Sequence, residues 1–284
     1  MSKVTIITDS TAYLPQNLVD NLSIQVIPLY VIWGEDTYKD NVDITSEEFY
    51  QMLQTSKVMP STSQPSPQDF INIYKPLVDQ KKDILSIHIS SKLSGTIDSV
   101  QQAKKTLAYE RLMIVDSLST SMAMGFVVLA AARAANEGKT LEECTKIAQK
   151  AIKDTHVYFV VDTLEFLKRG GRIGGASAFL GTALDLKPVL YIHEGKIEGF
   201  EKVRTKRKAL NRLVQICVDI IGEKKPIHFC VMHSVAVDDA NFVKESLTSR
   251  FDKNEIIEFL EAGLSPVIGT HVGPGAVAVA FMTE

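Results

Sequence analysis

The sequence lacks several features, each of which would mark a particular class of protein. Its 284 residues include only three cysteines, Cys144, Cys217 and Cys230, which lie far apart and form no C-x-x-C pair. A disulfide-stapled mini-protein is therefore excluded, and buried thiols that pack as small apolar groups are expected. The longest apolar stretch, residues 126–132, is followed by Arg133 and is far shorter than the roughly 20 residues of a membrane-spanning helix. We expect no segment that crosses a bilayer.

An excess of charge of one sign is also lacking. The chain has 31 Lys and Arg against 34 Asp and Glu, a net charge of −3, which gives no electrostatic reason to expect a nucleic-acid or anionic-membrane partner. The first residues run directly into a strand-like pattern without the apolar segment of a signal peptide, so a cytoplasmic location is expected. The six histidines show no H-E-x-x-H spacing and no EF-hand loop occurs, so no metal site is expected.

Length and periodicity predict an α/β protein of two domains. At roughly 150 residues per domain the chain has room for nearly two, and short β-branched runs alternate with segments of helical period. This order favours a mainly parallel sheet flanked by helices in the first half. We expect an N-terminal domain of residues 1–160 and a C-terminal α/β domain of residues 161–284. The expected strands are 4–8, 24–32, 84–89, 112–115, 157–161, 189–193, 197–203, 227–232, 256–260 and 277–282, and the expected helices are 46–55, 67–81, 94–108, 119–137, 140–153, 205–221 and 238–250.

Two hydroxyl-rich segments are candidates for binding an anion. The segment 90–96 follows an expected strand and opens a helix, which is the position where open α/β sheets bind ligands and where free helix amides face outward. There Ser94 offers a hydroxyl and Gly95 allows close approach to the backbone. The second segment holds Thr62 between stiffening prolines. An ordinary helix cap and an ordinary connecting loop are the alternatives, and the residues alone leave both open.

A glycine-rich segment near the C-terminus contains His271. It leads into a strand, whereas the dinucleotide fingerprint follows a strand and opens a helix, so a nucleotide site is rejected. What remains is a histidine between flexible turns that either faces an anion or is structural. No G-x-S-x-G elbow accompanies the serines and histidines, which disfavours a serine hydrolase. Asp9 and Ser10 after the first strand either bind a ligand or, more commonly, cap the next turn.

Seven short motifs follow one another along nearly the whole chain. They are TDST at 8–11, PSTSQP at 60–65, SSKLSGT at 90–96, VDS at 115–117, LEFLKRGGRI at 164–173, KPVL at 187–190 and HVGPG at 271–275. Taken together and in order, these motifs resemble the DegV family of bacterial fatty-acid-binding proteins, which includes the binding subunits of fatty acid kinase. The resemblance implies a two-domain DegV-like fold with a fatty acid held between the domains, its tail enclosed by the C-terminal one.

The resemblance also implies roles for single residues. Thr62 and Ser94 would hydrogen-bond the carboxylate of the ligand, helped by the backbone near Gly95, and His271 would lie close to the same head group. A bound anion is expected to raise the pKa of His271. Arg172 and Arg204 match arginines associated with the surface that faces a kinase partner.

The expected wall of the acyl tunnel comes from residues between 166 and 189, although for any one of them a place in plain core is favoured. The residues expected to line it are Phe166, Ile173, Phe179, Leu180, Leu184 and Val189.

The resemblance implies a lipid-binding protein and not an enzyme. It would bind a long-chain fatty acid such as palmitate, need no cofactor, and transport the lipid or present its carboxylate to a separate ATP-dependent kinase. No P-loop or glycine-rich kinase loop is visible in the sequence, which agrees with catalytic parts on another chain. A monomer is expected. The alternative is a stand-alone small-molecule kinase or acyl hydrolase.

Overall fold

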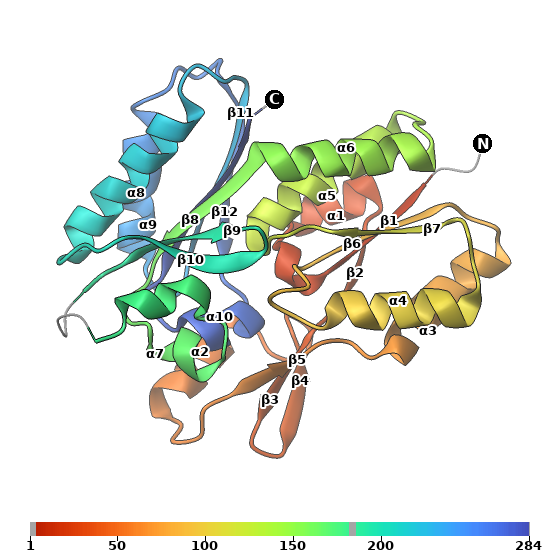
Figure 1. The fold of residues 1–284 in the computed structure, drawn as a ribbon, viewed down its shortest axis with the longest axis horizontal. Helices are drawn as coiled ribbons and strands as arrows, with labels where there is room; N and C mark the ends of the chain where they lie inside the picture. Colours follow the sequence, from red (N-terminus) through yellow and green to blue (C-terminus); the bar gives the residue numbers. More distant parts are fainter. Residues whose placement is uncertain (1–3, 182–185, 284) are drawn as a thin grey trace.

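The computed structural model describes residues 4–181 and 186–283, and within them the chain forms three β-sheets with helices between and around them (Figure 1). The first sheet has the order β2-β1-β6-β7 and is parallel throughout, as predicted. Its strands are β1 (Thr5–Asp9), β2 (Gln25–Ile27), β6 (Ile84–His88) and β7 (Leu112–Asp116).

Helices cover both faces of this parallel sheet, because alternate strand residues point to opposite sides. Ile7 and Ile84 pack on one side with α3 and α4, whereas Ile6 and Leu85 pack on the other with α5 and α6. Ser66 and Thr140 begin α3 and α6 with complete capping boxes, which explains why these helices were readable from the sequence. The helices are η1 (Ser10–Ala12), α1 (Gln16–Leu22), α3 (Pro67–Asp79), α4 (Thr96–Leu107), α5 (Ser121–Asn136) and α6 (Leu141–Asp154).

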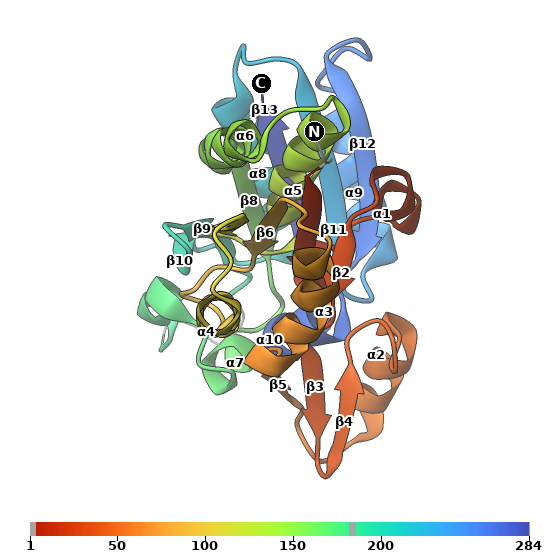
Figure 2. The same ribbon diagram turned by 90° about the vertical axis from the view of Figure 1, so that its right-hand side faces the viewer.

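A small three-stranded sheet lies at one end of the molecule beside α2 (Ser46–Thr55) and close to α10 (Figure 2). The prediction of one strand over 24–32 is wrong, since Pro28 has no N–H to continue the ladder and the chain passes from β2 of the first sheet to β3 of the small one. The strands of the small sheet, in the order β4-β3-β5, are β4 (Asp36–Lys39), β3 (Tyr30–Trp33) and β5 (Ser61–Ser63).

The second large sheet has six strands in the order β10-β9-β8-β13-β11-β12. The expected division at 160/161 assigned the strand near 157–161 to the first domain, but β8 pairs with both β9 and β13 inside the second sheet. Its elements are β8 (Thr155–Val160), β9 (Val189–His193), β10 (Lys196–Glu201), β11 (Ile227–His233), β12 (Ile256–Gly263) and β13 (Val277–Thr283), with α8 (Lys206–Ile221) and α9 (Val237–Thr248) on its outer face.

Helix α5 lies between the two large sheets. It contains the longest apolar run of the sequence, and nearly all of its residues are buried, as expected for a helix that is apolar all round. Residues of β1 and β6, α5, β8 and β13 belong to one continuous apolar cluster, so the two halves of the chain share a core. Across the described residues, no helix has the length and apolar character needed to cross a membrane.

Three short helical segments join these parts. Like η1 and α1 they were not predicted, because three to seven residues carry too little periodicity to be recognised. They are α7 (Glu165–Arg169), η2 (Gly174–Phe179) and α10 (Pro266–Val272).

Candidate functional site

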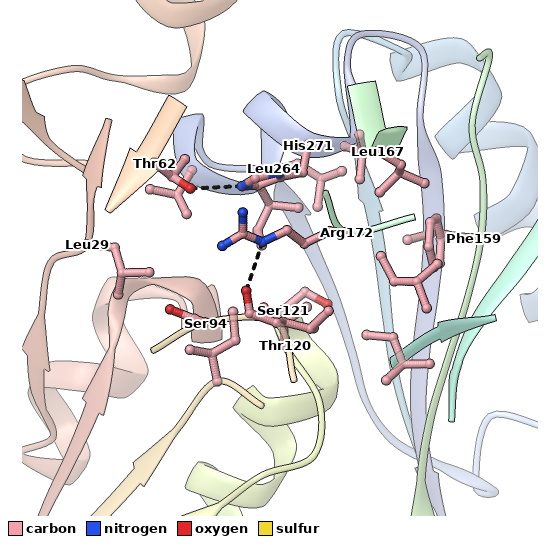
Figure 3. A pocket seen from close by; sticks show the side chains of 18 of the residues that line it. Leu29, Thr62, Ser94, Thr120, Ser121, Phe159, Leu167, Arg172, Leu264 and His271 are labelled. Atoms are coloured by element: carbon pink, nitrogen blue, oxygen red, sulfur yellow. Dashed lines mark hydrogen bonds between the residues drawn. The ribbon is translucent and has the colours of Figure 1, made fainter. Parts of the chain in front are cut away.

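A pocket lies between the two halves of the chain and holds about 850 Å³ of space, open solvent at its mouth included. Its wall combines the carboxyl edge of the parallel sheet, the small sheet, the inner face of the second sheet and α10 (Figure 3). Most of this wall is apolar. The apolar lining consists of Leu29, Ile89, Leu93, Val157, Phe159, Leu167, Ile192, Ile197, Leu264, Val267, Ile268, Val272, Ala276 and Ala278.

The hollow has a simple origin in the sequence of the last strand. The side of β13 that faces α5 carries Ala278 and Ala280, and Ala276 precedes them. Methyl groups at these positions fill little of the space between sheet and helix, and Ala276 and Ala278 line the cavity. On the opposite side of the same strand, Val279 and Phe281 pack tightly under α8 and α9.

Polar side chains gather at one part of the cavity wall. Thr62 Oγ1, on β5, lies 2.8 Å from His271 Nε2, on α10, although the two residues are 209 positions apart in the sequence. Both line the cavity together with Ser63 and Gln64. The structure therefore brings the proline-flanked hydroxyl segment and the C-terminal histidine to one place.

Arg172 adds a positive charge to this polar part. Its Nε donates to the carbonyl of Leu93 at 3.0 Å and its Nη1 to the carbonyl of Gly170 at 2.7 Å, and the guanidinium group lies between the Thr62–His271 pair and Ser94 (Figure 3). A guanidinium group has five N–H donors, so these two bonds leave donors for a ligand. Arg172 also lines the cavity, and its expected contact with a kinase partner stays a prediction.

Ser94 approaches the same part from the other side. Ser94 precedes Gly95, the N-cap residue of α4, which has no side chain to cap the helix. The Oγ of Ser94 lies 2.9 Å from Thr96 Oγ1. A Cβ atom at Gly95 would lie 2.9 Å from Gln64 Nε2, so the two hydroxyl-rich segments meet here. The first amides of α4 are free to face an anion beside Ser94.

The imidazole of His271 is held neutral by its surroundings. Burial is the main reason that the pKa of His271 falls from 6.5 to about 4, and the Arg172 cation beside it lowers the pKa further. The rise in the pKa of His271 that was expected from the sequence applies to the site with an anion bound. Its Nδ1 is buried without a hydrogen-bond partner, and a methyl group at Gly170 would overlap that side of the ring. Glycine at position 170 thus makes room for the imidazole.

His271 lies in the last turn of α10 and not between flexible turns as expected. The helix is anchored by Asp40, which is 1% exposed. Asp40 Oδ1 accepts the Val267 N–H at 3.2 Å, and Oδ2 accepts the hydroxyls of Ser265 and Ser10 at 2.9 and 2.7 Å. With no cation among these partners, burial raises the pKa of Asp40 to about 6.

None of the described residues that were expected to line the tunnel lines this cavity. Phe166 packs against Gly273, Phe179 lies under Lys202, and Val189 belongs to the cluster beneath α8. Leu180 is 40% exposed, and Ile173 packs against the shared core beside the cavity. Leu184 lies outside the described residues.

The remaining residues singled out in the sequence as candidates for binding lie elsewhere in the structure. Arg204 is exposed just before α8. Asp9 accepts the N–H and hydroxyl of Thr11, so it caps η1. Within residues 4–181 and 186–283, no group of His, Cys, Asp and Glu is arranged to hold a metal ion.

Two parts of the site were missed at the sequence level. Thr120 and Ser121 line the cavity at the start of α5, and they follow β7 just as Ser94 follows β6, so the rule applied to one strand end would have found the other. Asp40 gave no signal, since its partners Ser10 and Ser265 are distant in the sequence.

Comparison with known proteins agrees with this architecture. The family model described as "Uncharacterised protein, DegV family" matches residues 3–284. A DegV domain-containing protein of Streptomyces coelicolor is 39% identical over 277 residues, which cover 97% of each chain.

Two solved structures share the fold over nearly the full length. One, "Fatty Acid Binding of a DegV family Protein from Thermus thermophilus", is 38% identical with a TM-score of 0.92 and covers 99% of this chain and 100% of its own. The other, "Crystal Structure of DegV, a fatty acid binding protein from Bacillus subtilis", is 31% identical with a TM-score of 0.90 and covers 100% of both chains.

Proposed function

The chain belongs to the DegV family, and from this premise we propose that its cavity binds a long-chain fatty acid, with the carboxylate at Arg172 and the acyl chain along the apolar wall. The observation that carries the proposal is the combination of one cationic, hydroxyl-lined end with an otherwise apolar cavity. Both solved relatives described above are named as fatty-acid-binding proteins, which supports it.

The apolar wall would supply most of the affinity. An acyl chain with about 14 buried methylene groups gains roughly 11 kcal/mol of transfer free energy at about 0.8 kcal/mol each. Part of this gain is lost because the ligand and its torsions become ordered. Fourteen apolar residues from both halves of the protein line the cavity, so an acyl chain can contact apolar side chains along its length.

The carboxylate needs the polar end, because a carboxylate without partners in an apolar cavity costs several kcal/mol. Arg172 supplies the charge, and Thr62, Ser94 and the start of α4 supply hydrogen-bond donors. A neutral His271 that donates from Nε2 to Thr62 Oγ1 frees the Thr62 hydroxyl to donate to the carboxylate. The anion then offsets the effect of Arg172, so we expect the pKa of His271 to rise from about 4 when the acid binds.

The kinase partnership is part of the same proposal. The bound carboxylate would be presented to a separate ATP-dependent kinase, with Arg172 stabilising the charge that develops as acyl phosphate forms. Arg204, which is exposed, would contact that partner. In this arrangement the protein is the subunit that binds the fatty acid, and the kinase carries the residues that transfer the phosphoryl group.

Two arginine variants test the proposal. Arg172→Gln is expected to weaken fatty-acid binding in calorimetric titration by about 2 kcal/mol or more, since the buried carboxylate loses its counter-charge. Arg204→Gln, the matched control, is expected to bind normally but to lower acyl-phosphate formation with ATP and a fatty acid kinase. Equal binding by wild type and Arg172→Gln would contradict the head-group assignment, and turnover of ATP by the purified protein alone would contradict the presenting role.

A further inference from the structure

Two further hydroxyl groups line the cavity at the N-terminus of α5. Thr120 and Ser121 are 8% and 5% exposed, respectively, and both belong to the cavity wall. They lie on a different element from Thr62 and His271, at the end of the helix that separates the two large sheets (Figure 3). None of the head-group contacts described above uses them.

The Thr120 hydroxyl is an orphan. Its Oγ1 is buried and has no hydrogen-bond partner among the described residues. As the N-cap residue it would ordinarily accept an amide of the first turn of α5, but no side-chain cap is formed. Buried polar groups in proteins nearly always have a partner, so such an orphan needs an explanation.

A buried orphan hydroxyl is not by itself a binding site, as Thr8 illustrates. Thr8 Oγ1 is also buried without a partner, but Thr8 does not line the cavity. Thr120 differs because the residue lines the cavity and stands at the start of a 16-residue helix. The first-turn amides and the dipole of such a helix favour an electron-rich oxygen.

The surroundings indicate which oxygen fits. The side chains that share this cavity include Phe159, Val157 and Ile192. Among the described residues that line it, Arg172 alone carries a guanidinium group, and this group is already assigned to the carboxylate. A second charged group would lack a counter-ion, whereas a neutral hydroxyl or oxo oxygen needs only hydrogen bonds.

We infer that Thr120, Ser121 and the first turn of α5 form a second polar subsite that takes an oxygen substituent on the acyl chain. The preferred ligand is then a hydroxy or oxo fatty acid instead of a plain one. This inference rests on the proposed function, because it places the substituent on an acyl chain whose carboxylate lies at Arg172.

The test compares octadecanoic acid with a positional series of hydroxyoctadecanoic acids by calorimetric titration. Each acid is titrated into wild type, Thr120→Val and Thr8→Val. Valine keeps the shape of threonine and removes the hydroxyl, and Thr8→Val is the matched control for loss of a buried orphan hydroxyl away from the cavity. We expect one positional isomer to bind wild type more tightly than octadecanoic acid. Thr120→Val should reduce that preference about 5-fold, the value of one net hydrogen bond, and Thr8→Val should retain it.

The possible results distinguish failure of the second polar subsite from failure of the proposed function. If octadecanoic acid binds but no hydroxy isomer binds more tightly, the subsite is refuted and the proposed function stands. If Thr120→Val weakens the plain and hydroxylated acids equally, Thr120 holds the carboxylate and the inference is overturned. If neither kind of acid binds wild type, the proposed function itself fails.

Discussion

At the scale of single residues, the site depends on a few polar groups in apolar surroundings. Thr62, Ser94, Arg172 and His271 come from four separate segments and converge on one part of the cavity. In the proposed complex, each partner removed would leave part of a buried carboxylate without a hydrogen bond, and that loss would cost more than the bond itself contributes on average.

Removal of either hydroxyl is expected to weaken fatty-acid binding. Thr62→Val and Ser94→Ala should each cost about 1–3 kcal/mol of binding free energy, because each leaves the buried anion one donor short. Displacement titration with a fluorescent fatty acid measures both variants. Ser91→Ala, an exposed hydroxyl in the same loop, is the control and should bind like wild type. Unchanged affinity in both site variants would refute these contacts.

Asp40 is expected to make stability depend on pH in an unusual direction. Burial raises its pKa from 3.8 to about 6, so the folded state binds the proton more tightly than the unfolded state does. Its contribution is therefore fully present below about pH 4 and is lost as pH rises to about 6. A pKa difference of about two pH units corresponds to about 3 kcal/mol.

Asp40→Asn removes this titration and isolates its effect. The free energy of unfolding of wild type minus that of Asp40→Asn should fall by about 3 kcal/mol between pH 4 and pH 6 and stay constant above. Urea denaturation at several pH values measures both, with Asp36→Asn on exposed β4 as the control. A difference between wild type and Asp40→Asn that does not change with pH would show that Asp40 is not a buried titrating group.

At the scale of elements, the helices were readable from sequence and the short segments were not. The seven predicted helices agree with the structure to within two residues at each end, because apolar periodicity and capping residues such as Ser66 and Thr140 are local signals. Segments such as β5 and α10 depend on distant partners. Thr62 lies in a strand only because β3 pairs with it, and α10 begins where Asp40 accepts an amide.

The alanines of β13 provide an element-scale test of the cavity. Ala278→Leu should fill part of the wall and displace about three methylene groups, weakening the binding of long acyl chains by about 2 kcal/mol, with little loss of stability. Ala280→Leu lies on the same strand, but its side chain is in packed core and does not line the cavity. It should therefore destabilise the protein by about 1–3 kcal/mol.

Thermal denaturation and fatty-acid titration of both alanine variants distinguish these effects. If Ala278→Leu destabilises the protein as much as Ala280→Leu does, the space beside β13 is not available to a ligand.

The contact between α7 and α10 gives a second test at this scale. Gly170→Ala should displace the His271 imidazole, since the added methyl group meets the ring, and fatty-acid affinity should fall while the circular dichroism spectrum is retained. Position 170 has φ −73°, so alanine causes no backbone strain there. Gly263→Ala, where an added methyl group has open space, is the control. Wild-type affinity in Gly170→Ala would show that the His271 position is unimportant.

At the scale of the whole molecule, the order of the strands explains both what was predicted and what was missed. Parallel β6 and β7 end at the same edge, which brings Ser94 and Thr120 to one cavity, and the sequence rule for such edges anticipated the first of these. The apolar wall was not predictable, because Phe159, Ile192 and Ala278 come from three strands of a mixed sheet whose pairing no local pattern specifies. Strand β8, which ends at the expected domain boundary, likewise pairs with strands that follow it in the chain.

The most direct measurement is a crystal structure of the protein with hexadecanoic acid that carries bromine on its terminal carbon. Anomalous scattering locates the bromine without any assumption about the path of the acyl chain. The account predicts one bromine peak among the apolar side chains near Phe159 and Ile192, with the carboxylate density at Arg172 and Thr62. A bromine peak beside Arg172, or outside the cavity altogether, would contradict it.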